Sequence, residues 1–307
     1  MALPPLVERA ARPAVEKAVA APSLLRDFYE LTKPRMNFLV VITTAVGFYA
    51  ATAKAVHLNW VLLIHAVLGT ALTAAGASVL NQYVERDLDA KMPRTANRPL
   101  PTGRISEISA LLLGVILGAA GVLYLTAFVN PLTALLGAVT LGSYVWIYTP
   151  MKRWTSLCTI VGAVPGAIPP MMGFTALHNA ISPEAFALFG ILFLWQMPHF
   201  LAIAIMYKDD YAAGGFKMLP CVDPDLVTTG RQIVVYSLSL LPMTLMPFGL
   251  RMAGPGYLVA ALALGGVFLA YGIGLARNPS RENARKLFFV SIIYLPLLLG
   301  ALMVDKV

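Results

Sequence analysis

The chain has 307 residues, of which 58% are hydrophobic and only 12% are charged, and its mean hydropathy is +0.74. Because soluble domains carry about 25% charged residues, this composition excludes an ordinary soluble protein and indicates an integral membrane protein. The net charge of +8 is expected to come from basic residues in cytoplasmic loops, where they set the membrane topology and contact anionic lipids. The lipid bilayer is therefore a predicted partner, and nucleic acid is not.

The chain is expected to begin with a cytoplasmic tail over residues 1–30, followed by one membrane domain over residues 31–307. The first residues mix Ala, Pro and charged side chains and lack the apolar core of a secretory signal. Structures that span a membrane are helices or closed barrels, and long uninterrupted apolar runs favour helices. We predict an all-α integral membrane protein.

Nine apolar runs are candidates for transmembrane helices, which need about 20 residues each. They cover residues 36–53, 58–80, 107–128, 131–149, 157–176, 184–206, 232–252, 256–276 and 286–304. The fifth run contains Pro165, Pro169 and Pro170. Because proline removes a backbone hydrogen bond, we expect this helix to be kinked or broken inside the membrane.

The distribution of Lys and Arg residues predicts the membrane orientation. All but three of the 23 basic residues lie in the N-terminal tail or in the connections after the second, fourth, sixth and eighth predicted helices. The exceptions are Lys54, Arg251 and Lys306. Because positive loops stay in the cytoplasm, we expect a cytoplasmic N-terminus and, after nine spans, a C-terminus on the outside.

The connection after the second predicted helix carries a polar stripe within NQYVERDLDAKMPRTANRPLPTGR. If the helix continues into this segment, Asn81, Glu85 and Asp89 lie on one face at intervals of four residues. Carboxylate and amide oxygens suit Mg²⁺, which binds one or two carboxylates together with substrate phosphates and water. Asp87 points to another side of that helix and is a weaker candidate.

A second acidic cluster, Asp209 and Asp210, follows the sixth predicted helix and is expected on the same membrane face. Five of the eleven acidic residues beyond the N-terminal tail lie in these two segments, although the positive-inside rule requires none there. The two clusters could therefore hold a metal-bridged diphosphate between them. Basic residues that could neutralise the remaining phosphate charge are Arg94, Arg98, Lys152, Arg153 and Lys217. For each one, an ordinary topological role is the alternative.

Five stretches carry a wider similarity. They are LTKPRMNFL (31–39), NQYVERDLDAKMPRTANRPLPTGRIS (81–106), YTPMKRWTSLCTIVGAVPGAIPPMMG (148–173), WQMPHFLAIAI (195–205) and YKDDYAAGGFKMLP (207–220). These stretches resemble the intramembrane prenyltransferases and, within them, the haem O synthase (protohaem IX farnesyltransferase) family. The resemblance covers about residues 30 to 304 and implies nine helices around a central cavity, with two acidic motifs on the cytoplasmic side.

The resemblance is incomplete in both acidic motifs. Gln82 occupies a position where the broader family often has Asp, and Asp209 and Asp210 are adjacent where that family has two Asp residues spaced by four. These departures resemble the haem-modifying branch. They leave open whether one or two Mg²⁺ ions bind, and which of the two Asp residues is a ligand.

The resemblance implies transfer of the farnesyl group of farnesyl diphosphate to a vinyl group of haem B, with addition of water, giving haem O and diphosphate. Mg²⁺ and cationic side chains would stabilise the departing diphosphate. The expected metal ligands are Asn81, Glu85, Asp89 and Asp209, with Asp210 as the alternate. Tyr148 and Tyr207 are candidates for contacting diphosphate or shielding the cation, and an ordinary interfacial tyrosine is the alternative for each.

The implied location is the bacterial cytoplasmic (inner) membrane, with several spans. Farnesyl diphosphate and haem B are the implied substrates, and the product would serve assembly of haem-copper terminal oxidases. Haem A synthase or oxidase assembly proteins are the implied protein partners.

His199 lies within the sixth predicted helix, about 15 Å along the helix axis from Asp209. Intramembrane ionisable groups are functional candidates and neutral imidazole is a common haem-iron ligand, so His199 is a candidate haem ligand. The alternative is a histidine bonded to a neighbouring helix, which we favour for His65. Cys158 and Cys221 lack metal-site spacing and are interpreted as unpaired thiols.

Three other functions compete with haem farnesylation. Prenyl transfer to an aromatic acid, quinone precursor or chlorophyllide is disfavoured by Gln82 and by the PHF sequence at 198–200. A transporter would place ionisable groups at the membrane midplane, whereas these carboxylates cluster at one face, and no repeated halves are visible. A haem-binding assembly factor would not require Glu85 or Asp89.

Overall fold

The structure is a computed structural model that describes residues 23–53 and 57–307. Its long helices are α2 (Pro34–Ala51), α3 (Trp60–Asp89), α4 (Glu107–Phe128), α5 (Pro131–Gly142), α7 (Cys158–His178), α8 (Pro183–Met206), α11 (Val227–Gly249), α12 (Pro255–Arg277) and α13 (Arg281–Val304). The shorter elements are α1 (Leu24–Leu31), the π-helix η1 (Ser143–Tyr148), α6 (Thr149–Met151), α9 (Lys208–Ala213) and α10 (Leu219–Val222). Within the described residues, the prediction of an all-helical fold is confirmed.

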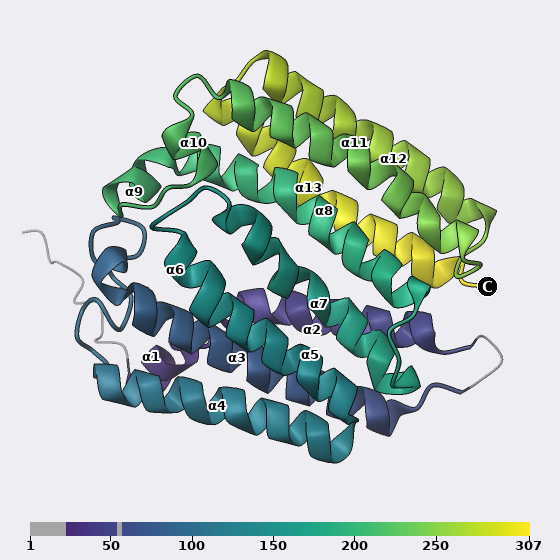
Figure 1. The fold of residues 1–307 in the computed structure, drawn as a ribbon, viewed down its shortest axis with the longest axis horizontal. Coiled ribbons are helices and arrows are strands. Elements are labelled where there is room, and N and C mark those ends of the chain that lie inside the picture. The colour runs from purple at the N-terminus through teal and green to yellow at the C-terminus, as the bar shows by residue number, and fades with distance from the viewer. Residues whose placement is uncertain (1–22, 54–56) are drawn as a thin grey trace, which may run out of the picture.

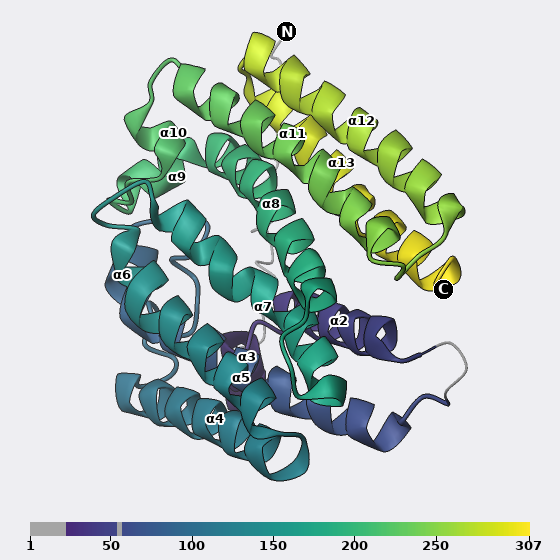
Figure 2. The ribbon, with the colours of Figure 1, turned by 45° about the vertical axis from the view of Figure 1, so that its right-hand side comes forward.

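The long helices form two groups that meet at α7 and α8 (Figures 1 and 2). Helices α2, α3, α4 and α5 pack on the α7 side, and α11, α12 and α13 pack on the α8 side. The connections after α3, α6, α8 and α12 gather at one end of the molecule, and the C-terminus lies at the other end (Figure 1). The connections that carry most of the basic residues therefore lie at one end of the molecule, as the distribution of Lys and Arg predicts. The orientation of that end in a membrane stays a prediction.

Eight helical segments of the described chain are long and apolar enough to cross a membrane, and α5, η1 and α6 together form one of them. Helix α2, which corresponds to the first predicted span, is not among the eight. It has only 18 residues and includes the polar residues Arg35 and Asn37 in its first turn. The protein is thus a multi-pass membrane protein, and the count of nine spans stays a prediction.

The predicted N-terminal tail is described only in part. Residues 1–22 lie outside the described residues, as does Lys54, one of the three basic residues expected on the opposite membrane face. The last part of the predicted tail folds as α1, and its buried Asp27 forms an ion pair with Arg104 at 3.0 Å. This pair ties α1 to the connection between α3 and α4.

Helix α7 is the most buried of the eight spanning segments. It continues as one α-helix from Cys158 to His178 through Pro165, Pro169 and Pro170, so the helix is not broken, and the expected kink stays a prediction. A proline inside a helix removes a backbone donor, but packing against neighbouring helices can compensate within a membrane. Here α2, α5 and α8 all pack against α7.

Two glycines allow α2 and α7 to cross with their backbones in contact. A Cβ atom on Gly47 of α2 would overlap the carbonyl group of Pro170, and one on Gly173 of α7 would overlap the carbonyl oxygen of Thr44. Small residues at such a crossing increase van der Waals contact, which drives helix association in membranes. The crossing holds α2, and the residues just before it, in a fixed position relative to α7.

We predict that Gly173→Ala lowers the free energy of unfolding by about 1–3 kcal/mol, because the added methyl group has no space at the crossing. Thermal unfolding in detergent would measure the loss. Gly266→Ala in α12 is the matched control, since a Cβ there would meet no atom of a neighbouring helix within 4 Å. Equal stability of the two variants would show that α2 and α7 do not cross this closely.

Candidate active site

The polar stripe predicted after the second span lies on one continuous helix. Helix α3 extends to Asp89, nine residues beyond the predicted end of the span, and so carries Asn81, Glu85 and Asp89 on one face. The three residues are 1%, 5% and 1% exposed. Buried carboxylates are costly unless they are paired, so the surroundings of this stripe decide what it can do.

Each carboxylate of the stripe is paired with a cation from a different connection. Lys152, which follows α6, places Nζ 2.7 Å from Oε1 of Glu85. Arg98, from the connection between α3 and α4, places Nη1 2.6 Å from Oδ2 of Asp89. Two of the five predicted phosphate-binding cations therefore contact the acidic stripe directly.

Lys33 is a third cation at the stripe, and its role was not predicted from the sequence. Its Nζ donates a hydrogen bond to Oδ1 of Asn81 at 2.7 Å. Lys33 precedes α2 with a left-handed backbone (φ 47°), a conformation that costs a non-glycine residue about 1–2 kcal/mol. The available signal was its place in LTKPRMNFL, directly before a proline at a helix start.

The lysine pKa values reflect crowding of charge at this site. Burial, and then the positive charges of Arg98 and Lys152, lower the pKa of Lys33 to about 7, against the opposing effect of Glu85. Burial also acts to lower the pKa of Lys152, but the adjacent Glu85 carboxylate outweighs it and raises that pKa well above its usual range. Lys152 is therefore held as a cation by its partner.

Aromatic rings lie beside the lysine of the Glu85 pair. Lys152 Nζ lies 4.5 Å from the ring centroid of Tyr148, and the rings of Tyr144 and Tyr148 are 5.3 Å apart. Both tyrosines belong to the π-helix η1, which the sequence pattern did not predict. Short π-helical turns are frequent at functional sites. Gly162 of α7 packs against the Tyr148 ring.

The segment with the second acidic cluster folds as α9 and packs against the connection after α3. The guanidinium of Arg94 stacks over the rings of Tyr207 and Tyr211, at 4.8 and 5.4 Å. On α9, Asp209 is exposed and Asp210 is half-buried. The structure therefore brings the two acidic segments together through Arg94, although the roles of the two Asp residues stay predictions.

Three other residues considered in the sequence analysis have different surroundings. Lys217 and Arg153 are exposed, and their side chains form no hydrogen bond or ion pair with the described part of the chain. Lys217 contacts the site only through its backbone N–H, which donates to the carbonyl of Lys152 at 2.7 Å. Gln82 is buried, and its amide donates to the backbone carbonyl of Leu31 at 2.7 Å. Gln82 thus anchors α1 to α3.

His199 lies on α8 and is stacked between two aromatic rings. Its ring centroid is 4.9 Å from that of Trp195 and 5.2 Å from that of Phe288. Its Nδ1 lies 2.7 Å from Oγ of Ser291, and that hydroxyl donates to the carbonyl of Phe288. Because the serine proton is already used, Nδ1 is the donor and Nε2 keeps a free lone pair. His65, in contrast, bonds to Tyr124 at 2.7 Å.

The oxygen atoms of the stripe fit a magnesium ion that takes some of its ligands from the protein and the others from the substrate and water. No group of three or more His, Cys, Asp or Glu side chains within the described residues is arranged to hold a metal. However, only Oε1 of Glu85 and Oδ2 of Asp89 are engaged by cations, which leaves one oxygen on each carboxylate. Mg²⁺ commonly uses one or two carboxylates and completes its shell with phosphate oxygens and water.

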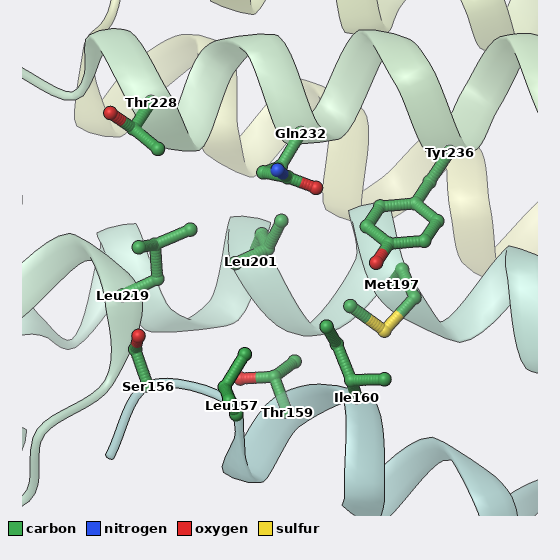
Figure 3. A pocket seen from close by; sticks show the side chains of 10 residues that line it. All are labelled: Ser156, Leu157, Thr159, Ile160, Met197, Leu201, Leu219, Thr228, Gln232 and Tyr236. Atoms are coloured by element: carbon green, nitrogen blue, oxygen red, sulfur yellow. The ribbon is translucent and has the colours of Figure 1, made fainter.

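A cavity of about 100 Å³ lies between α7, α8 and α11 (Figure 3), and its lining includes no residue of the stripe and none of the paired cations. Polar groups on its walls include Thr159, Gln232 and Tyr236, and no charged side chain lines it. A diphosphate needs cations, so this cavity does not suit one. The charged stripe of α3 is the better candidate for an active site.

Comparison with known proteins identifies the family. Residues 40–293 match the UbiA prenyltransferase family. The chain belongs to the UbiA prenyltransferase family. Among its UbiA-family relatives, the protoheme IX farnesyltransferase of Solibacter usitatus is 47% identical over 92% of this chain and 99% of the relative. The protoheme IX farnesyltransferase of Koribacter versatilis is 44% identical over 92% and 94% of the two chains.

Several solved structures have the same fold. A digeranylgeranylglyceryl phosphate synthase superposes with a TM-score of 0.75 at 17% identity, covering 92% of this chain and 98% of the other. A UbiA homologue from Archaeoglobus fulgidus bound to DMAPP and Mg²⁺ superposes with a TM-score of 0.62 at 17% identity, covering 90% and 99%. At these identities the likeness establishes the fold of this UbiA-family chain.

We predict that Lys152→Met lowers the free energy of unfolding by about 3–5 kcal/mol, because Glu85 is left as a buried, unpaired charge. The double variant Glu85→Gln/Lys152→Met should lose less, since both charges are removed together. Thermal unfolding in detergent would compare the variants. The exposed neighbour Arg153→Met serves as the control, and a double variant less stable than Lys152→Met would contradict the pairing.

Proposed function

We propose that this protein transfers the farnesyl group of farnesyl diphosphate to a vinyl group of haem B with addition of water, producing haem O and diphosphate. Support comes first from relatives named protoheme IX farnesyltransferase, which are 44–47% identical over nearly the full length of the chain. The buried stripe of Asn81, Glu85 and Asp89 with its three cations is the observation that carries the chemistry.

The cations at the stripe would bind the diphosphate group. Lys152 and Arg98 are held at the carboxylates before substrate arrives, so little side-chain ordering is needed when it binds. Lys33 adds a third cation from the start of α2. Arg94, Arg153 and Lys217 are further candidates at the outer edge of the site. Such fixed charges stabilise a leaving group more effectively than mobile water does.

Asn81, Glu85 and Asp89 would hold Mg²⁺, with Asp209 of α9, or Asp210 in its place, completing the ligands. A bound Mg²⁺ would neutralise charge that develops on the departing diphosphate. A UbiA homologue of the same fold binds DMAPP and Mg²⁺, which supports this assignment. One or two ions are compatible with the proposal.

The reaction breaks the bond between C1 of the farnesyl chain and the diphosphate oxygen, and the oxygen keeps the electron pair. The haem vinyl group then donates its π electrons to C1 and forms the new carbon–carbon bond. Water adds to the resulting cation on the haem side chain and loses a proton, which leaves a hydroxyl group. Tyr148 and Tyr207 would contact the diphosphate or shield the farnesyl cation, since aromatic faces attract positive charge.

His199 is the proposed axial ligand of haem B. The bond from Nδ1 to Ser291 fixes the ring and leaves Nε2 free, as is typical of metal-bound histidine. Stacking against Trp195 and Phe288 restricts the ring further. Haem iron is not the reacting centre, so this ligand would position the macrocycle.

The proposal includes a location and a topology. A domain over residues 31–307 would place nine spans around a central cavity, with the tail 1–30 in the cytoplasm and the C-terminus outside. The protein would lie in the cytoplasmic (inner) membrane of a bacterium. Its product would be passed to haem A synthase or to proteins that assemble haem-copper terminal oxidases.

We predict that Asp89→Asn lowers the rate of haem O formation by at least about 100-fold, because removing a charge that stabilises the transition state has effects of this size. The assay incubates membranes with haem B, farnesyl diphosphate and Mg²⁺ and detects the heavier haem by mass spectrometry. Removing Mg²⁺ with EDTA should abolish product. Asp87→Asn, on the exposed side of α3, is the matched control.

Several results would contradict this function. A product in which another acceptor carries the prenyl group would favour an aromatic or quinone-precursor prenyltransferase. Transport of labelled substrate without a covalent product would favour a transporter. Wild-type protein that binds haem B but forms no haem O, together with unchanged haem binding in Asp89→Asn, would favour a haem-binding assembly factor.

His199→Ala should shift the visible absorption spectrum of protein-bound haem B and weaken haem binding about tenfold or more, as expected for loss of a metal ligand. His65→Ala is the control, because its imidazole is already bonded to Tyr124. An unchanged haem spectrum in His199→Ala would show that this histidine has a structural role between α8 and α13.

A further inference from the structure

The hydroxyl of Thr149, the residue after the π-helix η1, makes two hydrogen bonds, one of them with Asn81 of the polar stripe. Its Oγ1 donates to the backbone carbonyl oxygen of Tyr144 at 2.7 Å. The same oxygen accepts a hydrogen bond from Nδ2 of Asn81 at 3.1 Å. Thr149 is 1% exposed and Asn81 is 1% exposed, so water does not compete easily for either group.

The direction of these bonds determines how the Asn81 amide is oriented. A threonine hydroxyl has a single proton, and here that proton is used on the carbonyl of Tyr144. Only oxygen lone pairs then face Asn81, so Asn81 must present its NH₂ group to Thr149. Its Oδ1 therefore points the other way, where Nζ of Lys33 donates to it at 2.7 Å.

The π-helical turn is what makes the Tyr144 carbonyl available. In a π-helix the backbone bonds join residues five apart, and the N–H of Thr149 donates to the carbonyl of Tyr144. The Thr149 hydroxyl donates to the same oxygen, so its direction is set by the turn itself. The backbone conformation of η1 therefore determines, through the Thr149 hydroxyl, how the Asn81 amide on α3 is oriented.

We propose that Thr149 is a positioning residue that fixes the Asn81 amide with its oxygen toward the Mg²⁺ and diphosphate site. This inference rests on the proposed function and assigns a role to a residue that would not itself contact substrate or metal. Without the hydroxyl, the NH₂ group loses its acceptor, and only the bond from Lys33 opposes a half-turn of the amide that would present NH₂ to the cations. A donor in that place repels Mg²⁺ and Lys33 instead of binding them.

The test measures binding of a prenyl diphosphate in the absence of haem. The probe is farnesyl S-thiolodiphosphate, an analogue that is not cleaved, titrated with and without Mg²⁺ into purified protein. Thr149→Val removes the hydroxyl and keeps the shape of the side chain, and we expect its Mg²⁺-dependent affinity to fall about 10–100-fold. Thr149→Ser should restore binding, because it keeps the hydroxyl. Thr159→Val is the matched control, since this buried threonine has no hydrogen-bond partner among the described residues.

A double-mutant cycle separates positioning from simple support of the helix. If Thr149 acts through Asn81, then Thr149→Val should cause no further loss of affinity in an Asn81→Ala background. If Thr149 only supports the π-helical turn, the losses of binding free energy caused by Thr149→Val and by Asn81→Ala should add in the double variant. That result would overturn the inference. Normal affinity in folded Thr149→Val would also overturn it.

The same titration distinguishes this inference from the proposed function. Wild-type protein that binds the analogue with Mg²⁺, together with an unaffected Thr149→Val, refutes only the positioning role. Wild-type protein that does not bind the analogue at any Mg²⁺ concentration refutes the proposed function as well.

Discussion

The structure depends on pairing two buried carboxylates at the C-terminal end of α3 with positively charged side chains. Glu85 and Asp89 are almost fully buried, and an isolated carboxylate in such a place costs several kcal/mol or takes up a proton. Each is stabilised by a cation that comes from a different connection, Lys152 after α6 and Arg98 after α3. The chain can bury this polar stripe only when both connections lie against the C-terminal end of α3. The two ion pairs therefore restrict where the segments after α3 and α6 can lie.

This balance also explains how an ion and a diphosphate could enter a site at the edge of an apolar bundle. In the free protein the acidic and basic side chains neutralise one another. Mg²⁺ and diphosphate bring charges of both signs, so the metal would bind the free oxygen of each carboxylate while the cations bind phosphate from their present positions. The net charge buried then changes little, which limits the desolvation cost. A site with only one sign of charge would lack this property.

Packing far from the charges keeps the participating elements in place. The close crossing at Gly47 and Gly173 fixes α2 against α7, and Lys33 sits immediately before α2. The π-helical turn of η1 directs the tyrosines and Thr149 toward α3. A rigid apolar frame therefore orients polar groups that lie on several separate segments, as precise electrostatic stabilisation requires.

The sequence by itself determined the protein class, the positions of the apolar helices and the stripe on α3, because hydropathy and helical periodicity depend on neighbours in the chain. It also supplied Lys152 and Arg98 as candidates from their basic character and their common membrane face. The contacts of Asn81 with Lys33 and Thr149 were not predictable, since they join residues 48 and 68 positions apart. Only the tertiary structure brought those residues together, and it also kept α7 helical through its prolines. Local patterns cannot report such contacts, because they arise when distant helices pack and must satisfy each other's polar groups.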